Sequence, residues 1–169
     1  NRLVRLLPDG QLDPSFVIGN GVEGFAGSSV SVRAFAIQPD GRIIVVGWFN
    51  AVQNNFRYGV ARLNLDGSVD VPFFLSLGIA EMESVALQSD GKILVGGRDV
   101  IYRIRPEGTV ENFPSPFPPA PLFRGRARSI VIQPDGKILV GFAPVTTRRH
   151  GLGQSSVPGH GRLCGRCRP

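Results

Sequence analysis

The stretch IQPDGRIIVVG at residues 37–47 decides the fold, because it recurs as LQSDGKILVGG at residues 87–97 and as IQPDGKILVG at residues 132–141. In two copies proline fixes φ at the first turn position; in all three, aspartate tolerates the second position and glycine supplies a left-handed residue. A cation and an unbroken apolar run follow, too short for a helix. Each copy therefore predicts a β-hairpin whose second strand is covered on both faces. The predicted turn residues are Asp40, Gly41, Asp90, Gly91, Asp135 and Gly136.

A second hairpin motif alternates with the first. It reads RLNLDGSVDVPF at residues 62–73, and related stretches occupy residues 5–16 and 103–113, the last one residue shorter before its phenylalanine. The first motif recurs after 50 and 45 residues and the second after 57 and 41. Periods of this length that hold four strands each are typical of β-propeller blades.

The alternation predicts an all-β fold, an array of four-stranded antiparallel β-propeller blades. If the two ends met, they would complete only a third blade, fewer than the four to eight of closed propellers. We therefore expect an open fragment of a larger propeller, or a chain that closes by self-association through its exposed ends. The expected units are a partial blade over 1–16, blades over about 31–73 and 83–113, and a partial blade over 128–142.

At these two motifs the chain resembles the delta-60 repeats of bacterial proteins, a group with a β-propeller fold. The resemblance covers about residues 2–142, with departures at Ser89, Glu107 and Phe142 and a deletion before Phe113. It implies large, often surface-exposed bacterial proteins without an established reaction. It brings no catalytic residues to this chain.

The second motif carries an arginine and a carboxylate eight residues apart, on either side of its turn. The third copy replaces aspartate by glutamate and keeps the charge. We expect one ion pair per blade, since partners across a short antiparallel turn approach closely and bidentate bonds fix register. A ring of charges lining a ligand-binding channel is the alternative, and repeats favour the structural interpretation. The expected pairs are Arg5 with Asp13, Arg62 with Asp70, and Arg103 with Glu111.

The formal charge of +6 is concentrated near the C-terminal end. Residues 143–169 hold five of the 19 basic residues and no acid, which leaves 14 basic against 13 acidic residues before them, or +1. A phosphate-binding footprint should instead lie on the folded domain. Glycine, arginine, serine and proline dominate this segment, so we expect residues 143–169 to be a disordered basic tail.

Signals of enzyme chemistry are few. His150 and His160 both lie in the tail, and so do Cys164 and Cys167, whose spacing is half of a zinc or redox motif. The turn aspartates are explained by turn geometry. Trp48 ends an apolar run and is interpreted as core rather than as a ligand platform. We expect no cofactor, no bound metal and no membrane-spanning segment.

These observations favour a non-enzymatic scaffold or binding module of a secreted or surface-exposed bacterial protein. The localisation rests on the family resemblance alone. The partners of this module would be further copies of the chain or neighbouring blades, or a protein or glycan ligand bound by the loops. A propeller enzyme acting on a carbohydrate or a small ester is the alternative, and nucleic-acid binding through the basic tail is third.

Overall fold

The computed structural model describes residues 3–24, 29–75, 81–111 and 125–144. Every named element in these residues is a β-strand, and every strand pair is antiparallel. The all-β prediction is therefore confirmed. Sheet 1 contains β2 (Ser31–Ile37), β3 (Ile43–Trp48) and β6 (Val60–Leu63); sheet 2 contains β7 (Met82–Leu87), β8 (Ile93–Gly97), β9 (Ile101–Ile104) and β10 (Val110–Glu111); sheet 3 contains β11 (Gly125–Ile132) and β12 (Ile138–Pro144).

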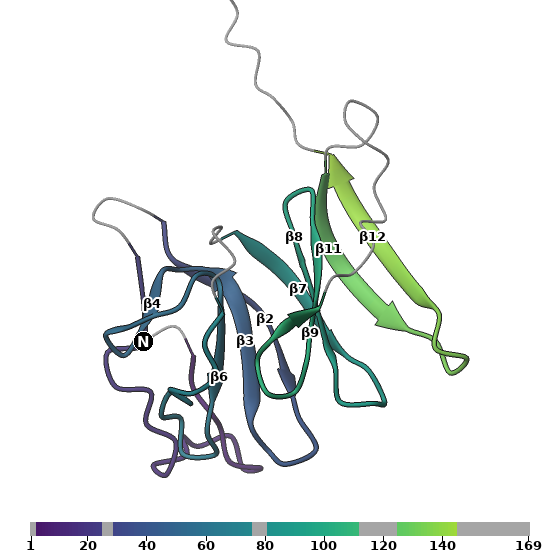
Figure 1. The fold of residues 1–169 in the computed structure, drawn as a ribbon. Coiled ribbons are helices and arrows are strands. Elements are labelled where there is room, and N and C mark those ends of the chain that lie inside the picture. The colour runs from purple at the N-terminus through teal and green to yellow at the C-terminus, as the bar shows by residue number, and fades with distance from the viewer. Residues whose placement is uncertain (1–2, 25–28, 76–80, 112–124, 145–169) are drawn as a thin grey trace, which may run out of the picture.

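The three sheets follow one another in chain order, with the N-terminal segments at one side of the array and β12 at the other (Figure 1). The first strand of each sheet lies next to the first strand of its neighbour, so that β7 contacts both β2 and β11. A hairpin over residues 3–16, called here the N-terminal hairpin, precedes sheet 1 and is closed by a bridge between Leu6 and Leu12. The sheets do not close into a ring.

The apolar runs explain why the sheets stack. In β3, Ile43 and Val45 face the N-terminal hairpin, whereas Ile44 and Val46 face sheet 2. Successive strand residues point to opposite faces, so an unbroken apolar run needs a neighbour on each side. We call the face toward the next sheet the forward face and the opposite one the backward face. In sheet 2 the forward residue Leu94 is fully buried against sheet 3.

A glycine at the end of β8 permits close contact between sheets 2 and 3. A Cβ atom on Gly96 would lie 2.7 Å from the Ala127 Cβ and 2.6 Å from the Ser84 Oγ, which leaves no room for a side chain. In the space so provided, the Ser84 hydroxyl donates a hydrogen bond of 2.6 Å to the Ala127 carbonyl. Gly96 therefore serves packing between sheets 2 and 3.

The three turns of the first motif share one geometry. Gly41, Gly91 and Gly136 have φ of 84°, 82° and 82°, in the left-handed region that glycine enters without strain. In the first turn the Gly41 amide donates to the Gln38 carbonyl at 2.8 Å and the Asp40 carboxylate accepts from the Arg42 amide at 3.1 Å. These bonds explain why Asp and Gly recur at the turn.

Strand number and limits differ from the expectation in three places. Sheet 2 has four strands, but sheet 1 has three, and only the bridge from Leu63 to Val69 stands in for a fourth. Sheet 3 runs over residues 125–144 rather than 128–142, since Arg126 still pairs with Ala143. A small side sheet has no counterpart in the predicted repeats; it is formed by β1 (Val22–Glu23), β4 (Ala51–Val52) and β5 (Asn55–Phe56).

Candidate functional site

Arg62 in β6 stands at the centre of a buried cluster. Its Nε donates to the Asp70 Oδ2 at 2.7 Å, and its guanidinium carbon lies 4.2 Å from the centre of the Phe73 ring. The Nη1 atom donates to the Pro106 carbonyl, which belongs to the second-motif turn of sheet 2. Only 6% of the Arg62 side chain is exposed. This arginine therefore pairs within its own hairpin and links that hairpin to the next one.

The N-terminal hairpin repeats this cluster. Arg5 Nε donates to the Asp13 Oδ2 at 2.7 Å, the guanidinium lies 4.8 Å from the Phe16 ring centre, and Nη1 donates to the Leu65 carbonyl at 2.6 Å. Leu65 and Pro106 are equivalent, each three residues after the arginine of its own copy. The Ser15 hydroxyl and amide, followed by Arg5, lower the pKa of Asp13 below its ordinary value of 3.8.

In the third copy, Arg103 Nε donates to the Glu111 Oε2 at 2.5 Å. The other oxygen of Glu111 accepts from Arg105 Nε at 3.0 Å, and this bond is the first cause that lowers the pKa of Glu111. The structure thus brings together the two members of each of the three expected pairs. Their bonds lie within and between hairpins, an arrangement suited to fixing register.

A different charged group lies where the first strands of the three sheets meet. Each of these strands has one residue at a β-bulge, outside the ladder with its neighbour, and these residues are Arg33, Glu83 and Arg128. A bulge redirects a side chain out of the regular alternation. Together with Trp48 and Arg126 they form what we call the axial cluster.

Glu83 is the buried centre of the axial cluster, with only 1% of its side chain exposed. Arg126 Nη1 donates to its Oε1 at 2.6 Å, and Arg128 Nη1 lies 3.5 Å from its Oε2. Arg33 Nε is farther away, at 4.0 Å. The side chains of Arg33 and Arg128 are 36% and 50% exposed, so both remain accessible from outside.

The Trp48 ring contacts two arginines of this cluster. The guanidinium carbons of Arg33 and Arg126 are 4.8 Å and 4.5 Å from its ring. Its Nε1 is buried and has no hydrogen-bond acceptor among the described residues. Phe49, the next residue, occupies the core instead and is 2% exposed. Trp48 therefore belongs to a polar group rather than to the core that its position at the end of an apolar run predicted.

The sequence contained one signal for the axial cluster. Arg33, Glu83 and Arg128 each stand five residues before the glutamine of the first motif. Their charges alternate in sign between copies, so no constant residue type marks the position. Their convergence depends on the bulges and on the stacking of three sheets, which the repeat pattern does not specify.

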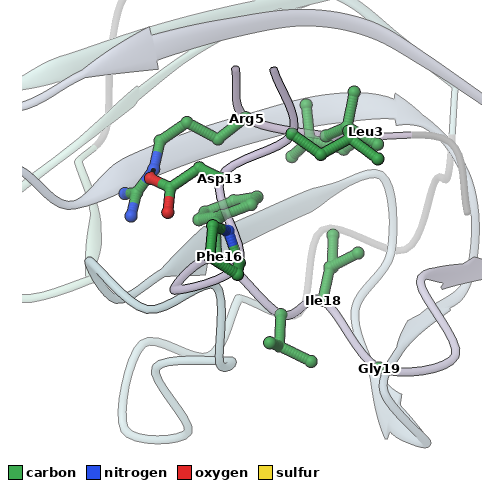
Figure 2. A pocket seen from close by; sticks show the side chains of 10 residues that line it. Leu3, Arg5, Asp13, Phe16, Ile18 and Gly19 are labelled. Atoms are coloured by element: carbon green, nitrogen blue, oxygen red, sulfur yellow. Dashed lines mark hydrogen bonds and ion pairs between the residues drawn. The ribbon is translucent and has the colours of Figure 1, made fainter. Parts of the chain in front are cut away.

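The N-terminal hairpin borders a cavity of about 410 Å³. Figure 2 shows Arg5 beside Asp13 at this cavity, together with the apolar side chains of Leu3, Phe16 and Ile18. A cavity of this size lies within the usual range for ligand pockets. The lining residues are Leu3, Val4, Arg5, Leu12, Asp13, Pro14, Phe16, Val17, Ile18 and Gly19.

The remaining candidates of the sequence analysis have no site around them in the described residues. Asp40, Asp90 and Asp135 accept hydrogen bonds from the amide two residues ahead in their own turns. In this part of the chain no group of three or more His, Cys, Asp or Glu side chains could hold a metal ion. None of its elements is a helix that could cross a membrane. The two histidines, the two cysteines and the arginines of the expected tail lie outside the described residues.

Comparison with known families agrees with the repeat pattern. Residues 1–16, 38–73 and 88–112 match a family described as a domain of unknown function (DUF5122) beta-propeller. No curated protein matches the chain. The matched segments contain the second hairpin motif three times and the first motif twice, so the same residues that build the hairpins carry the match. The name delta-60 repeat stays a prediction, while the match supports placing these segments in a β-propeller repeat family.

Proposed function

We propose that this chain is a non-enzymatic β-propeller scaffold and binding module, and that the axial cluster holds an acidic group of a partner protein. A secreted or surface-exposed bacterial setting is part of the proposal and rests on the resemblance to delta-60 repeats. The scaffold role is supported by the arginine clusters, whose guanidinium groups link one hairpin to the next. Their bonding capacity is used in holding blades together.

The observation that carries the binding role is the excess of donors in the axial cluster. Three guanidinium groups face two carboxylates, the buried Glu83 and the part-exposed Glu81, whose Oε2 lies 3.2 Å from Arg126, and the indole N–H of Trp48 lacks an acceptor among the described residues. A carboxylate from outside would add the missing acceptor and charge, and guanidinium groups bind carboxylates through paired hydrogen bonds. Two arginines already lie over the Trp48 ring, which favours a peptide carboxylate over a sugar stacked on the indole.

Trp48 makes the proposal directly testable, because it is the only tryptophan in the chain. Titration with a short polyglutamate peptide should change its fluorescence to saturation, whereas a polyglutamine peptide of equal length should not. The apparent affinity should fall as salt is added, since exposed charges are screened.

Substitutions then locate the site. Arg33→Gln or Arg128→Gln should weaken the binding of polyglutamate about tenfold, the effect of losing one charge-assisted contact of about 1.4 kcal/mol. Arg105→Gln is the matched control, because its side chain is 55% exposed and lies outside the axial cluster. Equal loss in all three variants would mean that the peptide binds through general charge. A response to polygalacturonate but not to polyglutamate would assign the site to glycans.

A further inference from the structure

The first sheet leaves part of its backward face uncovered. Phe35 and Ile37 in β2 are 58% and 63% exposed. The equivalent residues of sheet 3, Ile130 and Ile132, pack against sheet 2. Those of sheet 2 likewise pack against sheet 1. We call the first-motif hairpin of a blade its inner half and the second-motif hairpin its outer half. The N-terminal hairpin is an outer half, so the exposed residues mark where an inner half would pack.

In sheet 3 it is the forward face that is partly uncovered. Val131 in β11 and Leu139 in β12 are 53% and 64% exposed. The residues equivalent to Leu139 in the first two sheets, Ile44 and Leu94, are both fully buried against the following sheet. Sheet 3 is thus an inner half-blade whose forward side has no covering sheet in the described part of the chain.

The free strand edges complement each other in the same way. In sheet 1, β3 pairs with β6, and in sheet 2, β8 pairs with β9. The edge of β12 that would accept such a strand pairs with no strand within residues 3–144 as described. Residues 3–6 are the equivalent of β6, and their one bridge within the described residues is Leu6 to Leu12. Unpaired edges of this kind are templates for strand addition.

The cavity of Figure 2 lies where the missing strand would fit. Between sheets 1 and 2, Val60, Phe73 and Leu75 form one cluster with Ile44 and Val46 of β3. The residues equivalent to the first three are Leu3 and Phe16 of the N-terminal hairpin and Ile18 just after it, and all of them line the cavity. The cavity therefore corresponds to the position that the second strand of the first motif, such as β3 or β12, fills in a complete blade.

We propose that two copies of this chain associate head to tail, with β11 and β12 of each copy completing the blade begun by the N-terminal hairpin of the other. By the register of β3 with β6, Ile138 of one copy pairs with Leu6 of the second, and Leu139 pairs with Arg5. Leu139 then enters the cavity and covers Arg5, as Ile44 is the strand partner of Arg62. Val131 packs against Phe35 and Ile37 as Ala86 packs against Ile130 and Ile132.

The usual number of blades in a closed propeller favours a ring of two copies over a ring of one or three. The described residues of each copy form two internal sheets and two complementary half-blades, which together amount to three blades. A ring of one copy would have three blades and a ring of three copies nine, both outside the usual four to eight. Two copies give six blades, and a head-to-tail interface that closes after half a turn forms a two-fold ring.

The mass of the chain in solution tests this association. Light scattering on the full chain should give twice the 18.2 kDa of one copy. Leu139→Asp should reduce it to the mass of one copy, because the new charge would be buried in the partner's cavity. Phe56→Asp is the matched control: Phe56 is also 64% exposed, but it lies in the side sheet and should leave the mass unchanged. Circular dichroism of Leu139→Asp should retain the strand signal, since Leu139 is exposed within one copy.

A charge pair then tests the head-to-tail direction. Val131→Glu and Ile37→Lys should each give the mass of one copy, and the two substitutions in the same chain should restore the mass of two. A wild-type mass of 18.2 kDa at the highest soluble concentration overturns the proposal, because the chain would then stand open or close on itself. A double variant that remains a monomer also overturns it, since residues 37 and 131 would not meet across the interface.

Discussion

The cluster around Arg62 and the cluster around Arg5 contain the same groups in different surroundings. Both arginines donate from Nε to an aspartate at 2.7 Å and from Nη1 to a carbonyl of the next hairpin. Yet the Arg62 side chain is 6% exposed and the Arg5 side chain 36%. The hairpin motif is sufficient for the ion pair, but the neighbouring strand decides its burial.

This difference should appear most strongly when the arginines are removed. Arg62→Ala leaves Arg42, at 3.1 Å, as the remaining ion-pair partner of the buried Asp70 carboxylate among the described residues, and also removes the bond to Pro106. We expect it to lower the free energy of unfolding by about 3 kcal/mol, as for the loss of one partner in a buried pair. Arg5→Ala should have a much smaller effect, because solvent reaches its pair.

Urea denaturation of both variants, monitored by circular dichroism, measures this contrast. The comparison should be made below the concentration at which any association occurs, since a second copy that covers Arg5 would bring the two positions closer together. Equal losses of stability in a monomeric sample would mean that burial of the pair contributes little.

The turn glycines allow the exposed and the covered hairpin to be compared at a second position. Gly10 and Gly67 are equivalent and have φ of 86° and 88°. A Cβ atom on Gly67 would lie 3.1 Å from backbone atoms of Val17, whereas one on Gly10 would have no neighbour within 4 Å. Alanine at either site has the cost of the left-handed conformation, about 1 kcal/mol.

We therefore expect Gly67→Ala to cost about 2 kcal/mol, because the preceding segment must also shift, and Gly10→Ala about 1 kcal/mol. Thermal and urea unfolding of the two variants distinguish them. Equal destabilisation would show that the backbone conformation alone accounts for the effect, with no contribution from contact between hairpins.

Lowering the pH should produce the smallest change in the free energy of unfolding. The sign of this change follows from the pKa of Asp13. Hydrogen bonds from Ser15 and Arg5 lower the pKa of Asp13 in the folded state below 3.8. A depressed pKa contributes stability that is present above the unfolded value and is lost as the pH falls through the folded value. The difference in unfolding free energy between wild type and Asp13→Asn should thus be present at neutral pH and shrink below about pH 3.8. If this difference in unfolding free energy stays constant as the pH falls below 3.8, the shape of the Asp13 side chain matters rather than its charge.

Much of the hairpin chemistry was readable from the repeats. The sequence placed an Asp-Gly turn before each apolar run, and the structure has a left-handed glycine at all three. It also placed the arginine and carboxylate of the second motif on partner strands, as for Arg103 and Glu111, which are directly paired in the ladder. Such features are local, since a turn and its flanking residues are set by dihedral preferences and alternation.

The axial cluster could not be predicted in the same way. Arg33, Glu83 and Arg128 come from three strands far apart in the chain and point together only because each sits at a bulge. Bulges leave little trace in a single sequence, and the stacking of sheets determines which side chains meet. The side sheet was also missed, because its two-residue strands carry almost no periodic signal.

By itself, then, the sequence determined the hairpins, their alternation and the apolar character of both faces of each blade, all of which depend on contacts between near neighbours in the chain. The tertiary structure decided which of those faces are covered. Ile44 and Leu139 occupy the same position of the same motif, yet one is fully buried and the other 64% exposed. The physical reason is that burial depends on the presence of a following sheet, and no residue within a hairpin encodes that neighbour.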